Sequence, residues 1–222
     1  MTLAASAQRE QTREITIGPV DLEGILGLPH ESGGVVLFAH GSGSSRFSPR
    51  NNFVAQELRG AGLATLLFDL LTEEEARDRG NVFDIPLLAQ RLLMATAWVK
   101  QDPETASLPV GYFGASTGAA AALVAAASAA SPITAIVSRG GRPDLAGSAL
   151  AQVTAPTLLI VGGADATVLG LNRAALAALR CEKDLAVVPG ATHLFEELGA
   201  LETVVDLARH WFASHLAKGA AA

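Results

Sequence analysis

From residue 34 onward, short apolar runs alternate with stretches in which apolar residues recur at helical spacing. Runs that are apolar throughout are typical of strands covered on both faces, as in a parallel sheet whose connections are helices. Two earlier runs, separated by residues 19–21, alternate in character and predict an antiparallel hairpin. The chain is therefore predicted to be an α/β protein with about eight strands, mostly parallel, an antiparallel N-terminal hairpin and helices on both faces.

The expected strands cover residues 14–20, 22–28, 34–40, 64–70, 109–113, 133–138, 157–161 and 185–188. The expected helices cover residues 51–61, 86–100, 116–129, 169–179 and 201–216. The acidic residues 73–75 are expected to form a solvated loop or a short helix. Because no repeat or low-complexity linker interrupts this order, we expect residues 1–222 to be a single domain, with residues 1–13 as a poorly ordered leader.

Composition narrows the classes of partner. A net charge of -6 and a pI near 5.3 argue against nucleic acid, whose phosphates need a basic surface. The most apolar stretch, residues 118–130, is shorter than the roughly 20 residues that span a bilayer, so no membrane partner is expected. The single cysteine, Cys181, excludes an internal disulfide, and the N-terminus has no signal-peptide core, so a cytoplasmic location is expected. The oligomeric state is left open.

The pentapeptide at residues 114–118 has the pattern G-x-S-x-G and lies between an expected strand and an expected helix. A serine held in a sharp strand-to-helix turn leaves little room for side chains two residues away, and glycine meets that requirement. The turn exposes the serine hydroxyl and points the first N–H groups of the helix at the group that it attacks. This pattern predicts a hydrolytic enzyme with Ser116 as its nucleophile.

A serine nucleophile needs a histidine to take its proton and an acid to orient that histidine. His193 follows Ser116 in a loop that leaves an expected strand, and is the predicted base; the other four histidines lie before Ser116 or on the last expected helix. Asp165, after the strand at 157–161 and two glycines, is the predicted acid. Asp144 is its rival, with a helix N-cap as its alternative role.

The oxyanion hole should combine the N–H of the residue after the nucleophile with an N–H from the loop after the third strand. Thr117 supplies the first, and Ser42, in a glycine-rich loop, is predicted to supply the second. His40, at the start of that loop, is expected to be a structural histidine. Gly41-Ser42-Gly43 fails as a dinucleotide fingerprint because its third glycine position is Arg46, so we expect no cofactor. No metal site is expected either.

Four arginines fall on loops expected at the carboxyl ends of strands, although the chain as a whole is acidic. Arginine binds carboxylate or phosphate in bidentate fashion, so one or two of them could hold an anionic substrate beside Ser116. They could equally pair with Asp69, Asp144 or Glu196 and keep the loops in shape. The predicted substrate-binding residues are Arg46, Arg139, Arg142, Leu71 and Leu194, with Arg50 and Phe83 as further neighbours.

Together the elbow and several loop motifs resemble those of α/β-hydrolases of the dienelactone hydrolase-like family, over nearly the whole chain. The resemblance is closest to a small subgroup that in some bacteria is fused to a phosphoribosyltransferase domain, although the present chain has no such segment. The resembling stretches are residues 39–45, 48–51, 114–118, 138–144, 161–165 and 189–197. Dienelactone hydrolase proper uses a cysteine nucleophile, whereas this chain has Ser116 at that position, which puts dienelactone hydrolysis in doubt.

The resemblance implies an α/β-hydrolase fold and a carboxylesterase-like serine hydrolase that cleaves small esters through an acyl-enzyme. An acyltransferase, a thioesterase or a perhydrolase would use the same triad and is the alternative. A binding module without catalysis is a third hypothesis, which would be favoured by a missing triad member, and all three members are present.

Overall fold

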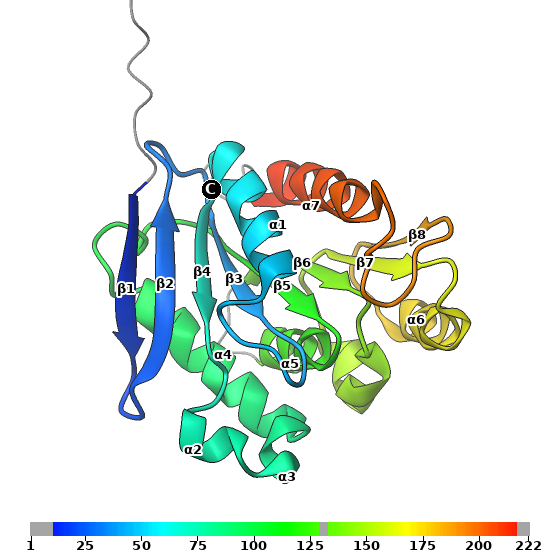
Figure 1. The fold of residues 1–222 in the computed structure, drawn as a ribbon, viewed down its shortest axis with the longest axis horizontal. Coiled ribbons are helices and arrows are strands. Elements are labelled where there is room, and N and C mark those ends of the chain that lie inside the picture. Colours follow the sequence, from blue (N-terminus) through cyan, green and yellow to red (C-terminus); the bar gives the residue numbers. More distant parts are fainter. Residues whose placement is uncertain (1–10, 129–132, 217–222) are drawn as a thin grey trace, which may run out of the picture.

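The computed structural model describes residues 11–128 and 133–216. Its strands form one eight-stranded sheet in the order β1-β2-β4-β3-β5-β6-β7-β8 (Figure 1). β1 and β2 are antiparallel, β2 also runs antiparallel to β4, and the remaining neighbours are parallel. The predicted α/β-hydrolase architecture, with an antiparallel N-terminal hairpin, is thereby confirmed.

The strands are β1 (Gln11–Ile17), β2 (Leu22–Leu28), β3 (Val35–Ala39), β4 (Ala64–Phe68), β5 (Val110–Ala115), β6 (Ile133–Arg139), β7 (Thr157–Gly162) and β8 (Lys183–Val188). The helices are α1 (Pro49–Gly60), α2 (Glu73–Ala76), α3 (Arg79–Val82), α4 (Ile85–Val99), α5 (Thr117–Ala126), α6 (Ala166–Ala178) and α7 (Ala200–Leu216), with a 3-10 segment η1 at Pro143–Gln152. Every expected strand and helix is present, with shifted ends.

One boundary differs from the sequence prediction, and one alternative that the sequence left open is resolved. β1 begins at Gln11, so residues 11–13, expected in the leader, pair with β2; the rest of that leader lies outside the described residues. The acidic segment forms α2, which Thr72 and Glu75 close with a reciprocal capping box. The 3-10 segment η1 and the short helix α3 carry too few periodic residues to be predicted from spacing.

Helices cover both faces of the sheet (Figure 1). One core cluster joins the sheet to α4, α5 and η1, and a second joins its other face to α1 and α7. α5 is the most buried helix element near the site: nine of its ten residues are buried, and most are alanine. Small side chains let this helix lie close to the strands, which fixes the turn that precedes it.

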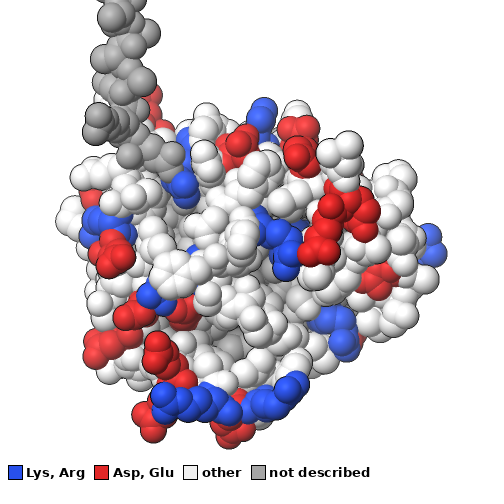
Figure 2. Space-filling model, viewed as in Figure 1, with Lys and Arg blue, Asp and Glu red and all other residues white. Residues whose placement is uncertain are grey.

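The parallel strands end at one edge of the sheet, where ligands collect in folds of this type. The loops after β3, β4, β5, β6, β7 and β8 meet there and carry the predicted site residues. Charged side chains of both signs are interspersed with uncharged surface on the face shown in Figure 2. Within residues 11–128 and 133–216, no helix is long and apolar enough to cross a membrane.

Candidate active site

Ser116 occupies a strained turn between β5 and α5. Its φ is 50° and its ψ is -120°, a conformation that residues with a side chain rarely adopt. Two backbone hydrogen bonds hold the turn: Ser116 N–H donates to the carbonyl of Arg139 at 3.3 Å, and Arg142 N–H donates to the carbonyl of Ser116 at 3.0 Å. The loop after β6 therefore fixes the turn from the side.

Both glycines of the pentapeptide are required by close backbone approach. A Cβ on Gly114 would lie 2.5 Å from Cα of Ala119, and a Cβ on Gly118 would lie 2.1 Å from the carbonyl oxygen of Ala39. Neither neighbour can move aside cheaply, because both are backbone atoms. The geometry of Ser116 is therefore that of a nucleophile elbow.

His193 and Asp165 come together as expected for a base and its orienting acid. His193 Nδ1 lies 2.8 Å from Asp165 Oδ2, and the other carboxylate oxygen accepts from the N–H of Val168 at 3.3 Å. Asp165 is thus also the N-cap of α6. An ionised carboxylate can only accept, so Nδ1 carries the proton and Nε2 is left as an acceptor, which suits a general base.

The loop after β6 connects this pair to the elbow. A Cβ added to Gly140 would lie 3.6 Å from Cε1 of the His193 ring, and the preceding residue, Arg139, accepts the hydrogen bond from Ser116 N–H. Among the described residues, Ser116 and His193 share this neighbour, but no hydrogen bond joins the hydroxyl to the ring. Such bonds are often long in enzymes without substrate.

Asp144 makes a different contact. Nε and Nη2 of Arg142 donate to its two carboxylate oxygens at 2.9 and 2.8 Å. The hydrogen bond from Arg142 lowers the pKa of Asp144. The carboxylate is therefore occupied by Arg142, whereas Asp165 is the acid at hydrogen-bond distance from His193.

The predicted oxyanion donors lie beside each other, with an arrangement that the sequence does not reveal. Ser42 N–H donates to the Thr117 hydroxyl at 2.9 Å. The loop also touches Ser116, because a Cβ on Gly41 would lie 3.0 Å from Cβ of Ser116. Thr117 opens α5, and the first N–H groups of a helix lack partners within it. One predicted donor is therefore bonded to a side chain in the free protein.

His40 ties the loop that holds Ser42 to the end of β4. Its Nδ1 lies 3.0 Å from the carbonyl oxygen of Gly41, and its Nε2 accepts from Leu70 N–H at 3.1 Å. These partners define the neutral ring with the proton on Nδ1. Burial lowers the pKa of His40, against opposing contributions from the bond to Gly41 and the charge of Asp69. The position agrees with the structural role expected from the sequence.

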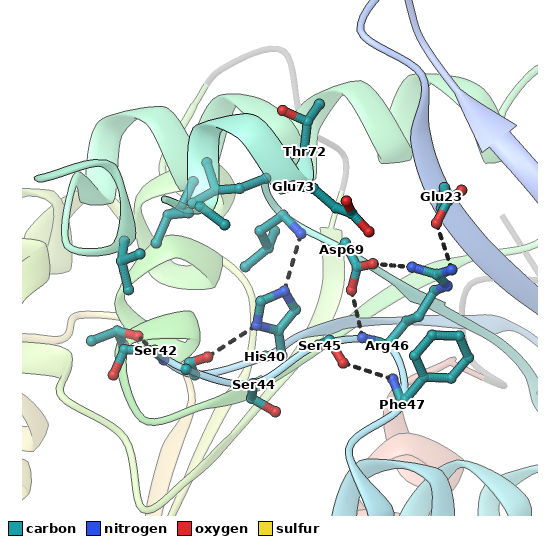
Figure 3. Close-up of a pocket in the computed structure, with 18 of the residues that line it drawn as sticks. Glu23, His40, Ser42, Ser44, Ser45, Arg46, Phe47, Asp69, Thr72 and Glu73 are labelled. Atoms are coloured by element: carbon teal, nitrogen blue, oxygen red, sulfur yellow. Dashed lines mark hydrogen bonds and ion pairs between the residues drawn. The ribbon is translucent and has the colours of Figure 1, made fainter. Parts of the chain in front are cut away.

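A cavity of about 540 Å³ opens beside Ser42 and Thr117, and we call it the side cavity. Its apolar lining comes from Leu70, Leu71, Ala76, Val82, Leu88 and Phe47. Its polar lining includes Asp21, Glu23, His40, Arg46, Asp69, Thr72 and Glu73, several of which are labelled in Figure 3. Leu71 thus lines it, as expected for a substrate wall, whereas Leu194 and Phe83 are 41% and 51% exposed and are not part of its lining.

Three of the four loop arginines are paired with carboxylates. Arg46 pairs with both Glu23 and Asp69, and its guanidinium lies 4.2 Å from the centre of the Phe47 ring. Arg50 pairs with Glu196 at 3.1 Å, and Arg142 pairs with Asp144 as described.

The fourth arginine, Arg139, is only 8% exposed, and its Nη1 is buried without a hydrogen-bond partner in the part of the chain that the structure describes. Burial and the nearby charge of Arg50 lower its pKa to about 10.

Asn172 is a supporting residue that sequence reasoning missed. Its side chain is fully buried in α6 and donates to the carbonyl oxygens of Gly141 and Val168, at 3.0 and 2.8 Å. One helix thereby holds both Asp165 and the loop beside Ser116. In the sequence, the available signal for this role was a single amide side chain, Asn172, among mostly apolar residues of the expected helix. Within the described residues, no cluster of side chains is suited to a metal ion.

Comparisons with known proteins identify the family and the fold. The model of the dienelactone hydrolase family matches residues 22–209. A dienelactone hydrolase from Anabaena variabilis is 56% identical, with a TM-score of 0.89, over 94% of this chain and 98% of that one. The protein Est1E from Butyrivibrio proteoclasticus is 16% identical, with a TM-score of 0.77, over 90% of this chain and 98% of that one, and shows the shared fold alone.

A curated relative from Mycobacterium tuberculosis (strain CDC 1551 / Oshkosh) bears the name "Putative phosphoribosyl transferase". It is 61% identical over 208 residues, which are 94% of this chain and 47% of the relative. This chain therefore spans about half the length of the curated relatives that it matches.

Proposed function

We propose that this chain, which belongs to the dienelactone hydrolase family, is a serine hydrolase that cleaves small carboxylic esters through an acyl-enzyme. The observation that carries the proposal is the 2.8 Å contact between His193 Nδ1 and Asp165 Oδ2, beside a serine held in a strained elbow. This arrangement supplies a nucleophile, a base with a defined proton position and an acid that orients it.

In the first half of the reaction, Ser116 Oγ attacks the ester carbonyl carbon while its proton passes to Nε2 of His193. Negative charge develops on the carbonyl oxygen, which accepts from the N–H groups of Thr117 and Ser42. The bond to the alcohol oxygen then breaks, and the alcohol leaves with the proton from His193. The acyl group stays on Ser116.

In the second half, His193 takes a proton from water, whose oxygen attacks the acyl carbon. The tetrahedral intermediate collapses, the proton returns to Ser116 Oγ, and the carboxylic acid leaves. Asp165 stays ionised throughout and stabilises the imidazolium that forms twice in each cycle.

The Ser42 donor must change partner during this cycle. In the free protein it bonds to the Thr117 hydroxyl at 2.9 Å. A substrate oxyanion is a stronger acceptor than a neutral hydroxyl, so the exchange favours the transition state over the ground state. The Thr117 hydroxyl therefore holds the donor in place until charge develops.

The free cysteine has no part in the proposal. Cys181 lies before β8, and its Sγ is 3.8 Å from Oγ1 of Thr157, at the start of β7. That is the amino end of the strand, opposite the edge that carries Asp165. The proposed nucleophile is therefore Ser116 and not Cys181, although the family takes its name from dienelactone hydrolases.

Transfer of the acyl group to an alcohol, a thiol or peroxide would use the same acyl-enzyme, and product analysis with competing acceptors separates these outcomes.

The test of the proposal is hydrolysis of 4-nitrophenyl acetate by the wild type, Ser116→Ala and Cys181→Ser. We expect Ser116→Ala to lose turnover and Cys181→Ser, the matched control, to keep it. Turnover that survives Ser116→Ala would reject the proposal, and tight ligand binding without turnover in the wild type would favour a binding module.

A further inference from the structure

The side cavity adjoins the proposed oxyanion donors, because Ser42 and Thr117 both line it. Ser116 itself does not line the cavity, so an ester bound at Ser116 as proposed would reach it past these two residues, with either its acyl or its alcohol group. Its volume of about 540 Å³ is within the range of small-molecule sites. The chemistry of its lining therefore bears on which esters fit.

Arg46 is the single arginine or lysine among the residues that line this cavity, and it is fully engaged. Its guanidinium pairs with Glu23 at 2.5 Å and with Asp69, while its backbone N–H also donates to Asp69 at 2.6 Å. Figure 3 shows the guanidinium between the two carboxylates, with Phe47 beside it. A substrate anion would have to displace two ion pairs to reach it.

The remaining charge of the side cavity is negative. Four carboxylates line it against one guanidinium, and Asp21 and Glu73 are exposed residues without an ion pair among the described residues. His40 adds no positive charge near neutral pH, because Leu70 N–H donates to its Nε2 and the ring is held neutral. The unpaired carboxylates of Asp21 and Glu73 would therefore repel an anionic group of a substrate that enters the cavity.

The rest of the lining is apolar. Leu71, Val82 and Leu88 come from three different elements or loops and contribute carbon surface to one space. Burial of apolar surface favours binding of a group that is itself apolar. The lining thus combines an apolar wall with unpaired carboxylates.

We infer that the side cavity selects esters in which the group that enters it is apolar and either uncharged or cationic, and that it discriminates against a carboxylate on that group. Asp21 and Glu73 are the proposed specificity-determining residues. The inference rests on the proposed function, since it concerns the ester bound at Ser116. In this proposal Arg46 has a structural role in its ion pairs with Glu23 and Asp69 and does not bind a substrate anion.

The test compares kcat/KM within two matched series of esters. In the first, 4-nitrophenyl esters carry an acyl chain that ends in a methyl, a carboxylate or a trimethylammonium group. In the second, acetate esters carry an alcohol with the same three ends. In the series whose varied group enters the cavity, we expect the anionic ester to be about tenfold poorer than the neutral one at low ionic strength, and the cationic ester to be at least as good.

Two charge-neutral variants locate the source of the discrimination. Glu73→Gln and Asp21→Asn should each reduce the ratio between neutral and anionic esters; asparagine also suits the positive φ of residue 21, which is 53°. Glu74→Gln is the matched control, since Glu74 lies next to Glu73 on α2 but does not line the cavity. It should change the ratio less.

The absence of a penalty on the anionic ester in both series, whether the rates are equal or the anion is preferred, would overturn the inference. So would ratios that Glu73→Gln and Asp21→Asn leave unchanged. If neutral esters are hydrolysed in a Ser116-dependent way without charge selection, the inference fails while the proposed function stands. If Ser116→Ala leaves ester hydrolysis intact, the proposed function itself fails.

Discussion

The backbone N–H of Ser42 donates to the side-chain hydroxyl of Thr117 across 2.9 Å, and Thr117 is the residue that follows the nucleophile. The two predicted oxyanion donors are therefore linked to each other before any substrate arrives. The bond joins the loop after β3 to the first turn of α5. It also gives the exposed edge of the oxyanion site a defined geometry in the free protein.

Thr117→Val keeps the shape of this side chain and removes the acceptor. Thr117 is buried whereas Ser42 is exposed, so Ser42 N–H should lose this acceptor and turn to water, at a cost of about 0.5–1.5 kcal/mol, the net worth of one hydrogen bond. We expect a lower Tm, and a larger rise in Tm on reaction with a fluorophosphonate than in the wild type, because the adduct oxygen gives Ser42 a new acceptor. Thermal unfolding of both proteins, with and without the adduct, measures this. Equal rises would show that Ser42 N–H does not face the oxyanion.

Asp165→Asn should impair catalysis far more than Asp144→Asn. An amide at residue 165 can donate to His193 and favour the wrong tautomer, which cost about 10⁴-fold in kcat in the well-studied serine protease triad. Asp144 pairs with Arg142 instead, so its variant should stay within about tenfold of the wild type. Steady-state kinetics with 4-nitrophenyl acetate distinguish the two. A reversed order of the losses would move the acid to Asp144.

His40 should make the protein less stable in mild acid. Burial lowers the pKa of His40 below its ordinary value of 6.5, so the unfolded chain binds this proton more readily. Stability should fall as the pH drops below about 6.5 and level off below the lowered folded pKa. Urea unfolding at several pH values should show a smaller fall in His40→Gln, which keeps an acceptor for Leu70 N–H and does not titrate. An equal fall in both proteins would contradict the assignment of the neutral ring.

Asn172→Ala should lower both stability and turnover. The variant loses two buried hydrogen bonds, one of them to the carbonyl of Gly141, and leaves that acceptor unpaired at a cost of about 1–3 kcal/mol. Because the same loop holds the carbonyl of Ser116 through Arg142 N–H, the elbow should lose precision and kcat should fall more than KM changes. Kinetic measurements under conditions in which the variant remains folded distinguish this loss of precision at the elbow from a loss of stability. Unchanged kcat would confine Asn172 to a packing role.

The sharp turn at Ser116 and the pairing of His193 with Asp165 were predictable because each depends on local pattern and chain order. Gly114 and Gly118 mark a close approach of backbone that no other residue allows, and the strand-to-helix position of Ser116 follows from the alternation of elements. Spacing also predicted the sheet, since buried strands and amphipathic helices differ in period.

The partners of Arg46 were only half predictable. Asp69 was among its possible partners in the sequence, but Glu23 comes beside it because β2 pairs with β4, and Asp69 N–H donates to the Glu23 carbonyl at 3.0 Å. Strand order across a sheet cannot be read from periodicity. The hydrogen bond between Ser42 and Thr117 could not be predicted either, since it depends on a side-chain rotamer that is set by packing.

In the proposed mechanism, Ser116 carries the acyl group during turnover. Rapid acid quenching of the enzyme with 4-nitrophenyl acetate, followed by mass spectrometry of the protein and its peptides, tests this directly. We predict a mass increase of one acetyl group on the peptide that contains Ser116, absent from Ser116→Ala. Continued turnover with no adduct on Ser116, or an adduct on Cys181, would contradict the claim.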